Sequence, residues 1–254
     1  HPLMADINLN ELATVLDSED MIGFTRVFVE DIRKGFRNVT LERYPWMEEI
    51  GNTDWQGVLA LGMGGSAAGG DFLSALCNLK GKVPVVVQRD YVIPSWWNEK
   101  WLVISTSHSG NTEEAIDATE IALQAGATVI VISTGGILSG LAEIHYNCYF
   151  IPSIGGQPPR SAFGHIFARQ LALFKGIGIL PDDEDNEVML ERLQSVVDDY
   201  DFTAKHDSDF IELISYLATQ PIALLGPTEL MPALNRFKNQ LNENSARFAR
   251  IGIF

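Results

Sequence analysis

Cysteines are almost missing from this sequence. Only two of the 254 residues are cysteine, Cys77 and Cys148, and two isolated thiols do not provide the ligand spacing of a metal site. Both lie in apolar patterns typical of buried thiols, which indicates a reducing compartment, the cytoplasm. Long apolar runs are also lacking, because none approaches the roughly 20 residues that a membrane-spanning helix needs. We therefore expect neither a metal centre nor a membrane segment.

Basic side chains are scarce as well. The sequence has 18 lysines and arginines against 33 acidic residues, a formal net charge of −15. Nucleic acids and anionic membranes bind basic surfaces, so the composition predicts neither as a partner. The same charge repels anionic metabolites at long range. A phosphate site in this protein must therefore work through local hydrogen-bond donors.

The stretch from Trp101 to Glu114 has the pattern of a strand, a polar turn and a helix. Leu102–Ile104 is a short apolar run typical of a buried strand, and helical spacing begins at Glu113. The turn between them, STSHSGNT, has hardly any apolar atoms. Its backbone N–H groups would lie at the positive end of the helix, where anions bind.

Hydroxyl groups in this turn, from Ser107, Ser109 and Thr112, add further donors. The alternative is ordinary helix capping by Asn111 or Thr112. The polar run is longer than one cap requires, so we favour an anion-binding loop.

A second glycine-rich turn comes earlier in the chain. Val58–Leu61 reads as a buried strand, and Gly62–Ser66 (GMGGS) leads from it into a helix over 67–79. The GxGxxG spacing of dinucleotide-binding loops is not met, so this turn alone leaves a nucleotide and a sugar phosphate equally open. Two such turns at strand ends of one parallel sheet can converge on a single ligand at a switch point.

The order of the expected elements predicts an α/β fold with a doubly wound parallel sheet. Residues 4–50 read as an N-terminal helical arm, with one helix over Met21–Phe36, and residues 51–177 as a first α/β domain. Residues 178–254 read as a linker and part of a second, similar domain, which we expect to be incomplete. His1–Leu3 precede the first methionine and are typical of a cloning-vector remnant.

Arg160 stands out because basic residues are rare. It follows a loop of glycine and proline, SIGGQPP, and precedes an expected helix. An arginine there could pair with a phosphate or stabilise an oxyanion. By position alone, a surface arginine with a salt-bridge partner is the stronger interpretation.

Five motifs together resemble a known family. They are GMGGS (Gly62–Ser66), RDYVIP (Arg89–Pro94), STSHSGNTEE (Ser105–Glu114), GGQPPRSAFGH (Gly155–His165) and NQLNENSA (Asn239–Ala246). In order and spacing they resemble the bifunctional phosphoglucose/phosphomannose isomerases, which are built from two sugar isomerase (SIS) domains. The resemblance implies a SIS fold and an enzyme that interconverts glucose 6-phosphate and fructose 6-phosphate through an enediol. It leaves open whether mannose 6-phosphate is also a substrate.

The resemblance also implies roles for individual residues. The implied substrate-binding residues are Gly64, Gly65 and Ser66 for the sugar and Ser107, Ser109 and Thr112 for the phosphate. Arg160 would stabilise the enediolate, and Glu243 would be the base that moves a proton between C1 and C2. This chemistry needs a carboxylate and an oxyanion partner but no metal or cofactor. A ring-opening histidine and a lysine of the family are expected beyond Phe254, so the chain is expected to be truncated and could be inactive as it stands.

A second class of function stays open at this point. SIS modules also bind sugar phosphates as regulatory ligands, without catalysis, and such a module would not need Glu243. A third reading is a SIS isomerase of pentose or amino-sugar phosphates. The apolar face of the arm and the shared sites of the family predict a homodimer. We expect it to act in the cytoplasm, in glycolysis or gluconeogenesis.

Overall fold

A five-stranded parallel sheet forms the centre of the protein. The computed structural model describes residues 8–90, 92–204 and 208–254, so the expected vector remnant and the first residues of the arm lie outside the described part. The strands are β1 (Gly57–Leu61), β2 (Val85–Gln88), β3 (Trp101–Thr106), β4 (Val129–Ser133) and β5 (Cys148–Pro152). Their order is β2-β1-β3-β4-β5, and every neighbouring pair is parallel. The winding direction reverses between β1 and β3, which makes that pair the switch point of the sheet.

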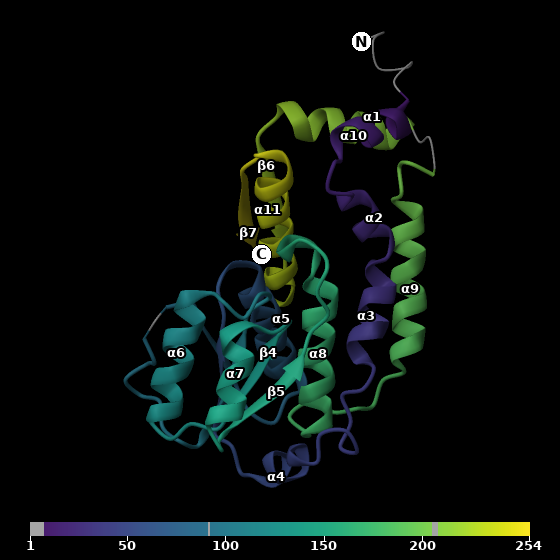
Figure 1. Cartoon of the computed structure of the whole chain (residues 1–254). Coiled ribbons are helices and arrows are strands. Elements are labelled where there is room, and N and C mark those ends of the chain that lie inside the picture. Colours follow the sequence, from purple (N-terminus) through teal and green to yellow (C-terminus); the bar gives the residue numbers. More distant parts are fainter. Residues whose placement is uncertain (1–7, 91, 205–207) are drawn as a thin grey trace.

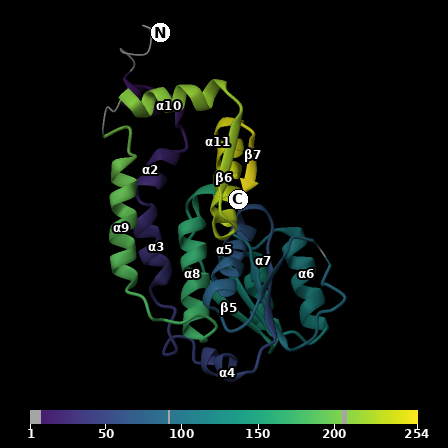
Figure 2. The same ribbon diagram turned by 180° about the vertical axis from the view of Figure 1, so that it is seen from behind.

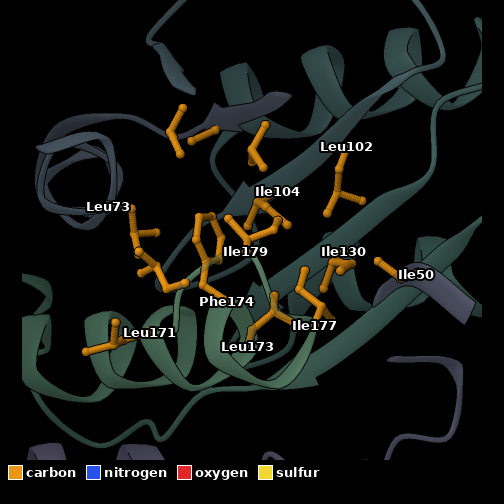
Figure 3. Packing of buried hydrophobic residues seen from close by; sticks show 14 of the residues in the cluster. Ile50, Leu73, Leu102, Ile104, Ile130, Leu171, Leu173, Phe174, Ile177 and Ile179 are labelled. Carbon is orange, nitrogen blue, oxygen red and sulfur yellow. The ribbon is translucent and has the colours of Figure 1, made fainter. Parts of the chain in front are cut away.

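Helices cover both faces of this sheet (Figure 1). The helices on one face are α4 (Trp46–Asn52), α5 (Gly64–Lys80) and α8 (Phe163–Gly176), and those on the other are α6 (Glu113–Gln124) and α7 (Gly136–Ile144). Successive strand residues point to opposite faces, so Leu102 and Ile104 join the α5 and α8 side, where Phe174 is also buried (Figure 3). Val103 packs on the α6 and α7 side. The predicted doubly wound sheet is confirmed.

In the described part of the N-terminal arm, three short helices precede α4: α1 (Leu9–Leu16), α2 (Met21–Arg26) and α3 (Phe28–Phe36). The prediction of one continuous helix over Met21–Phe36 is wrong, because Val27 has φ −91° and ψ 7° and ends α2. Helix α3 lies between α8 and α9 (Asn186–Asp199), as both views show (Figures 1 and 2).

The last part of the chain, from Ser208 onward, carries a separate two-stranded sheet. It contains α10 (Ser208–Thr219), β6 (Ile222–Gly226), α11 (Met231–Ser245) and β7 (Ala249–Ile253), with β6 and β7 paired in parallel. Short 3-10 turns precede α8 and α11, η1 (Pro159–Ser161) and η2 (Thr228–Leu230). Helix α11 contacts α5 and lies beside the segment that precedes α8, to which it is hydrogen-bonded (Figure 1). Among the described residues, no helix is long and apolar enough to cross a membrane.

Candidate active site

The two predicted loops meet at the switch point of the sheet. Gly64 begins α5 with φ +51°, a conformation that glycine adopts without strain. The Ser66 hydroxyl of the first loop accepts a hydrogen bond from the backbone N–H of His108 in the second, at 3.3 Å. No side chain caps the start of α5 in the described structure. The first turn of this helix can therefore present N–H groups to a ligand.

Hydroxyl groups shape the β3–α6 loop from within. The Ser107 hydroxyl accepts a hydrogen bond from Gly110 N at 3.1 Å and shares one with the Thr112 hydroxyl at 2.9 Å. The exposed Ser109 hydroxyl accepts from Asn111 N at 3.1 Å. Thr112 is the N-cap residue of α6, but its side chain makes no capping bond. Ordinary capping therefore does not account for this polar run, and the first-turn N–H groups of α6 have no side-chain partner in the described structure.

The β3–α6 loop packs tightly on the loop after β4. Gly110 has φ +72°, and a Cβ atom at this position would overlap the carbonyl oxygen of Gly135. The Asn111 side chain accepts a hydrogen bond from Ile137 N at 3.0 Å. The His108 carbonyl accepts from the hydroxyl of Thr134 at 2.8 Å. These contacts tie the shape of the predicted phosphate loop to the neighbouring loop.

Arg160 lies in η1, and three groups hold it. Its Nε donates to the Asn244 side chain at 3.1 Å, and its carbonyl accepts from the Gln240 amide at 3.1 Å, both from α11. Its Nη2 forms an ion pair with Glu19, which lies between α1 and α2. The salt-bridge interpretation of this arginine therefore has a partner in the structure, and that partner comes from the N-terminal arm.

Arg160 and Glu243 line the same cleft. The cleft has a volume of about 430 Å³, with Gln240, Asn244 and Glu19 among its other lining residues. Glu243 is solvent-exposed on the last turns of α11.

The substrate-binding positions that the sequence predicts lie outside the lining of this cleft. They are Gly64, Gly65, Ser66, Ser107, Ser109 and Thr112. A Cβ atom placed at Gly65 would lie 4.0 Å from the Pro159 carbonyl, so the start of α5 borders the segment that carries Arg160. The structure thus brings Arg160 and Glu243 together and places the first glycine loop beside them.

A buried hydrogen bond between side chains anchors the end of β3, where the β3–α6 loop begins. Gln170 of α8 donates to the Thr106 hydroxyl at the end of β3, at 2.9 Å. Gly69 leaves the room for it, because a Cβ atom there would overlap the Gln170 amide oxygen.

A buried contact between a histidine and an aspartate joins α3 to α8. Asp31 Oδ1 lies 3.3 Å from His165 Nε2. Burial raises the pKa of Asp31 and lowers the pKa of His165, because each loses hydration of its charged form. His165 is buried inside the protein.

Sequence reasoning missed Glu19, Asn244 and Gln170. Glu19 lies 141 positions from Arg160 in the chain, and Gln170 lies 64 from Thr106. No local spacing pattern connects residues so far apart. Only Asn244 had a signal, because it is a neighbour of Glu243 in the NQLNENSA motif.

Comparison with known proteins shows what the whole chain is similar to. No family model matches the chain. A bifunctional phosphoglucose/phosphomannose isomerase from Caldicellulosiruptor bescii is 35% identical over 203 residues, covering 78% of this chain and 59% of that protein. The chain is homologous to the bifunctional phosphoglucose/phosphomannose isomerases. It spans less than two thirds of the length of this relative.

Two further comparisons bear on the family and the fold. A D-glucosamine-6-phosphate 4-epimerase from Sulfolobus acidocaldarius is 28% identical over 188 residues, covering 72% of this chain and 56% of that protein. The crystal structure of tagatose-6-phosphate ketose/aldose isomerase from Escherichia coli aligns with a TM-score of 0.70 at 19% identity, covering 91% of this chain and 66% of that one. The latter match shows the fold: the main sheet with its covering helices has the SIS fold.

Proposed function

We propose that this chain carries the proton-transfer centre of an aldose–ketose isomerase that interconverts glucose 6-phosphate and fructose 6-phosphate. The observation that carries the proposal is the shared cleft of Glu243 and Arg160. Isomerisation removes a proton α to a carbonyl, which needs a carboxylate base and a cation for the developing oxyanion. Glu243 supplies the first and Arg160 the second.

Substrate binding is assigned to the two loops at the switch point. Gly64, Gly65 and Ser66 at the start of α5 are the proposed sugar-binding residues. The phosphate is assigned to the β3–α6 loop, through the hydroxyl groups named above and the uncapped N–H groups of α6. The bonds that now join these hydroxyls to each other would be exchanged for bonds to the phosphate.

The glutamate is tested by Glu243→Gln, which keeps the size of the side chain and removes the base. In the complete protein we expect kcat for isomerisation to fall by about 10²–10⁴-fold while substrate affinity changes little. Glu229→Gln is the matched control, since it removes the same charge from an exposed residue outside the cleft. Parent activity in Glu243→Gln would show that another group is the base and would favour a binding module without catalysis.

The phosphate loop is tested by Ser109→Asp. This change places a negative charge where the phosphate is assigned, and like charges brought together cost about 2–5 kcal/mol of binding free energy. Calorimetric titration with fructose 6-phosphate measures the effect. Unchanged affinity would show that the phosphate binds elsewhere and not at the β3–α6 loop.

The epimerase relative supplies a second candidate reaction. It is named for an amino-sugar phosphate, glucosamine 6-phosphate, and its match covers 72% of this chain. Incubation with glucosamine 6-phosphate, followed by proton NMR of the sugar, would reveal a new epimer. We expect none if the isomerase assignment is right.

We also propose that the protein works as a homodimer in cytoplasmic glycolysis or gluconeogenesis. Val15 and Leu16 of α1 are 76% and 70% exposed, an apolar surface that a second subunit could cover. Sedimentation of the complete protein as a monomer at micromolar concentration would contradict the dimer.

A further inference from the structure

A carboxylate from the N-terminal arm forms an ion pair with Arg160. Glu19 pairs with Nη2 of Arg160, and both residues line the cleft that contains Glu243. The pair is only partly covered, with side chains 54% and 32% exposed. Solvent and small solutes can therefore reach both groups.

The turn that carries Glu19 is held by its own hydrogen bonds. The Asp17 carboxylate accepts from the backbone N–H groups of Met21 and Ile22, both at 2.8 Å. Asp20 adopts φ +54°, a left-handed conformation that is uncommon outside glycine, and its N–H donates to the Asp17 carbonyl at 3.1 Å. Glu19 therefore sits on a shaped turn, directed at the cleft.

The chemistry of the contact matches that of the proposed intermediate. A carboxylate holds two coplanar oxygens that share one negative charge, and an enediolate presents two neighbouring coplanar oxygens with the same charge. A guanidinium offers planar, paired donors that suit both. In Arg160 one donor already binds Asn244, and Glu19 takes another.

We propose that Glu19 is a specificity-determining residue of this site, because its carboxylate competes for the Arg160 guanidinium with any negative charge at the reacting end of a ligand, so that the site disfavours ligands that arrive as anions there and yields Arg160 only to the enediolate that forms from a neutral substrate. The inference rests on the proposed function, since it assumes that the reacting carbons lie at Arg160. Displacement by the enediolate frees the turn over 17–20 from η1, so formation of the intermediate and release of the arm are coupled. A ligand that is neutral at the reacting end binds without replacing Glu19.

The local charge supports this selectivity. Before a ligand enters, the cleft is lined by the carboxylates of Asp17, Glu19 and Glu243 and by the guanidinium of Arg160. A second anion can approach the guanidinium only against the repulsion of Glu19. Removing that carboxylate should help an anionic group far more than a neutral one.

The test compares two sugar phosphates by calorimetric titration. 6-Phosphogluconate has a carboxylate at C1, and glucitol 6-phosphate has a neutral hydroxyl there. Glu19→Gln should tighten 6-phosphogluconate by about three- to thirtyfold and glucitol 6-phosphate by less than about twofold. Glu48→Gln, an exposed glutamate on α4 outside this cleft, is the matched control and should change neither.

Arg160→Ala identifies the partner of Glu19. In the Arg160→Ala background, Glu19→Gln should no longer tighten 6-phosphogluconate, because the competition has been removed. Equal tightening of both ligands, or tightening that persists without Arg160, would overturn the proposal, since both results indicate a general charge effect.

The two levels of the proposal fail in different ways. Binding of both ligands with no effect of Glu19→Gln overturns the role of Glu19 and leaves the proposed function intact. Binding of neither ligand to any variant overturns the proposed function and the displacement together. Amide hydrogen exchange tests the contact between Glu19 and Arg160. Glu19→Gln should speed exchange of the α2 amides, and an unchanged exchange rate also counts against the inference.

Discussion

Gly110→Ala should destabilise the protein more than Gly126→Ala, although both glycines have positive φ. The φ angles are +72° and +89°. A Cβ atom at Gly110 would overlap the carbonyl oxygen of Gly135, whereas one at Gly126 would meet nothing within 4 Å. The pair of variants therefore separates backbone strain from the packing of the β3–α6 loop.

The expected magnitudes follow from these two terms. An alanine in the left-handed region costs about 1–2 kcal/mol, so Gly126→Ala should lose that much. Gly110→Ala has the same strain, and overpacking against backbone adds about 1–3 kcal/mol. We therefore expect Gly110→Ala to lose about 2–5 kcal/mol in the free energy of unfolding.

Urea unfolding followed by tryptophan fluorescence measures both losses by linear extrapolation. Binding of fructose 6-phosphate gives a second readout, since only Gly110→Ala should deform the proposed phosphate loop. Equal losses of stability in the two variants would refute the packing of this loop on the loop after β4.

Three further predictions concern buried groups. Gly69→Ala should lower the free energy of unfolding by about 1–3 kcal/mol in urea, because the new methyl group displaces the buried Gln170 amide from its hydrogen bond, and adding Gln170→Ala should recover part of the loss. Burial raises the pKa of Cys148 to about 12, so a thiol reagent at pH 8 should label it only as fast as the protein unfolds. Burial lowers the pKa of His165 below 6.5, so below that pH the unfolded chain binds more protons than the folded protein and stability falls. The raised pKa of Asp31 has the opposite effect, because it favours the folded state as the pH drops. His165→Gln should therefore lose less stability than the parent between pH 6.5 and 5 in urea titrations.

Much of the fold could be predicted because its signals are local. The strand before the β3–α6 loop was predicted from the apolar run Leu102–Ile104, and β3 covers Trp101–Thr106 with residues 102–106 buried, so Ser105 and Thr106 belong to the strand and not to the predicted turn. Alternation of such runs with helical spacing is enough to predict a parallel sheet with both faces covered. The break at Val27 was missed because apolar spacing continues through it, and periodicity does not report a single backbone turn.

The site could be predicted only in part. Motif spacing identified the loops, but the partner of Arg160 comes from a distant segment, and nothing around Glu19 in the sequence distinguishes it from other surface acids. The role of the Ser107 hydroxyl could not be predicted either, because Ser107 is 1% exposed and its hydroxyl forms hydrogen bonds within its own loop. Residue type indicates which bonds a side chain can form, whereas packing decides which of them it forms.

The most direct test of the account is exchange of the C2 proton of the sugar with solvent. Fructose 6-phosphate is incubated with the complete protein in D2O, and NMR follows deuterium in the glucose 6-phosphate that forms. We expect deuterium at C2 with the parent and with Glu229→Gln, and a loss of exchange by about 10²–10⁴-fold with Glu243→Gln, because base and exchange share one step. Undiminished exchange in Glu243→Gln would contradict the central claim that this cleft performs the proton transfer.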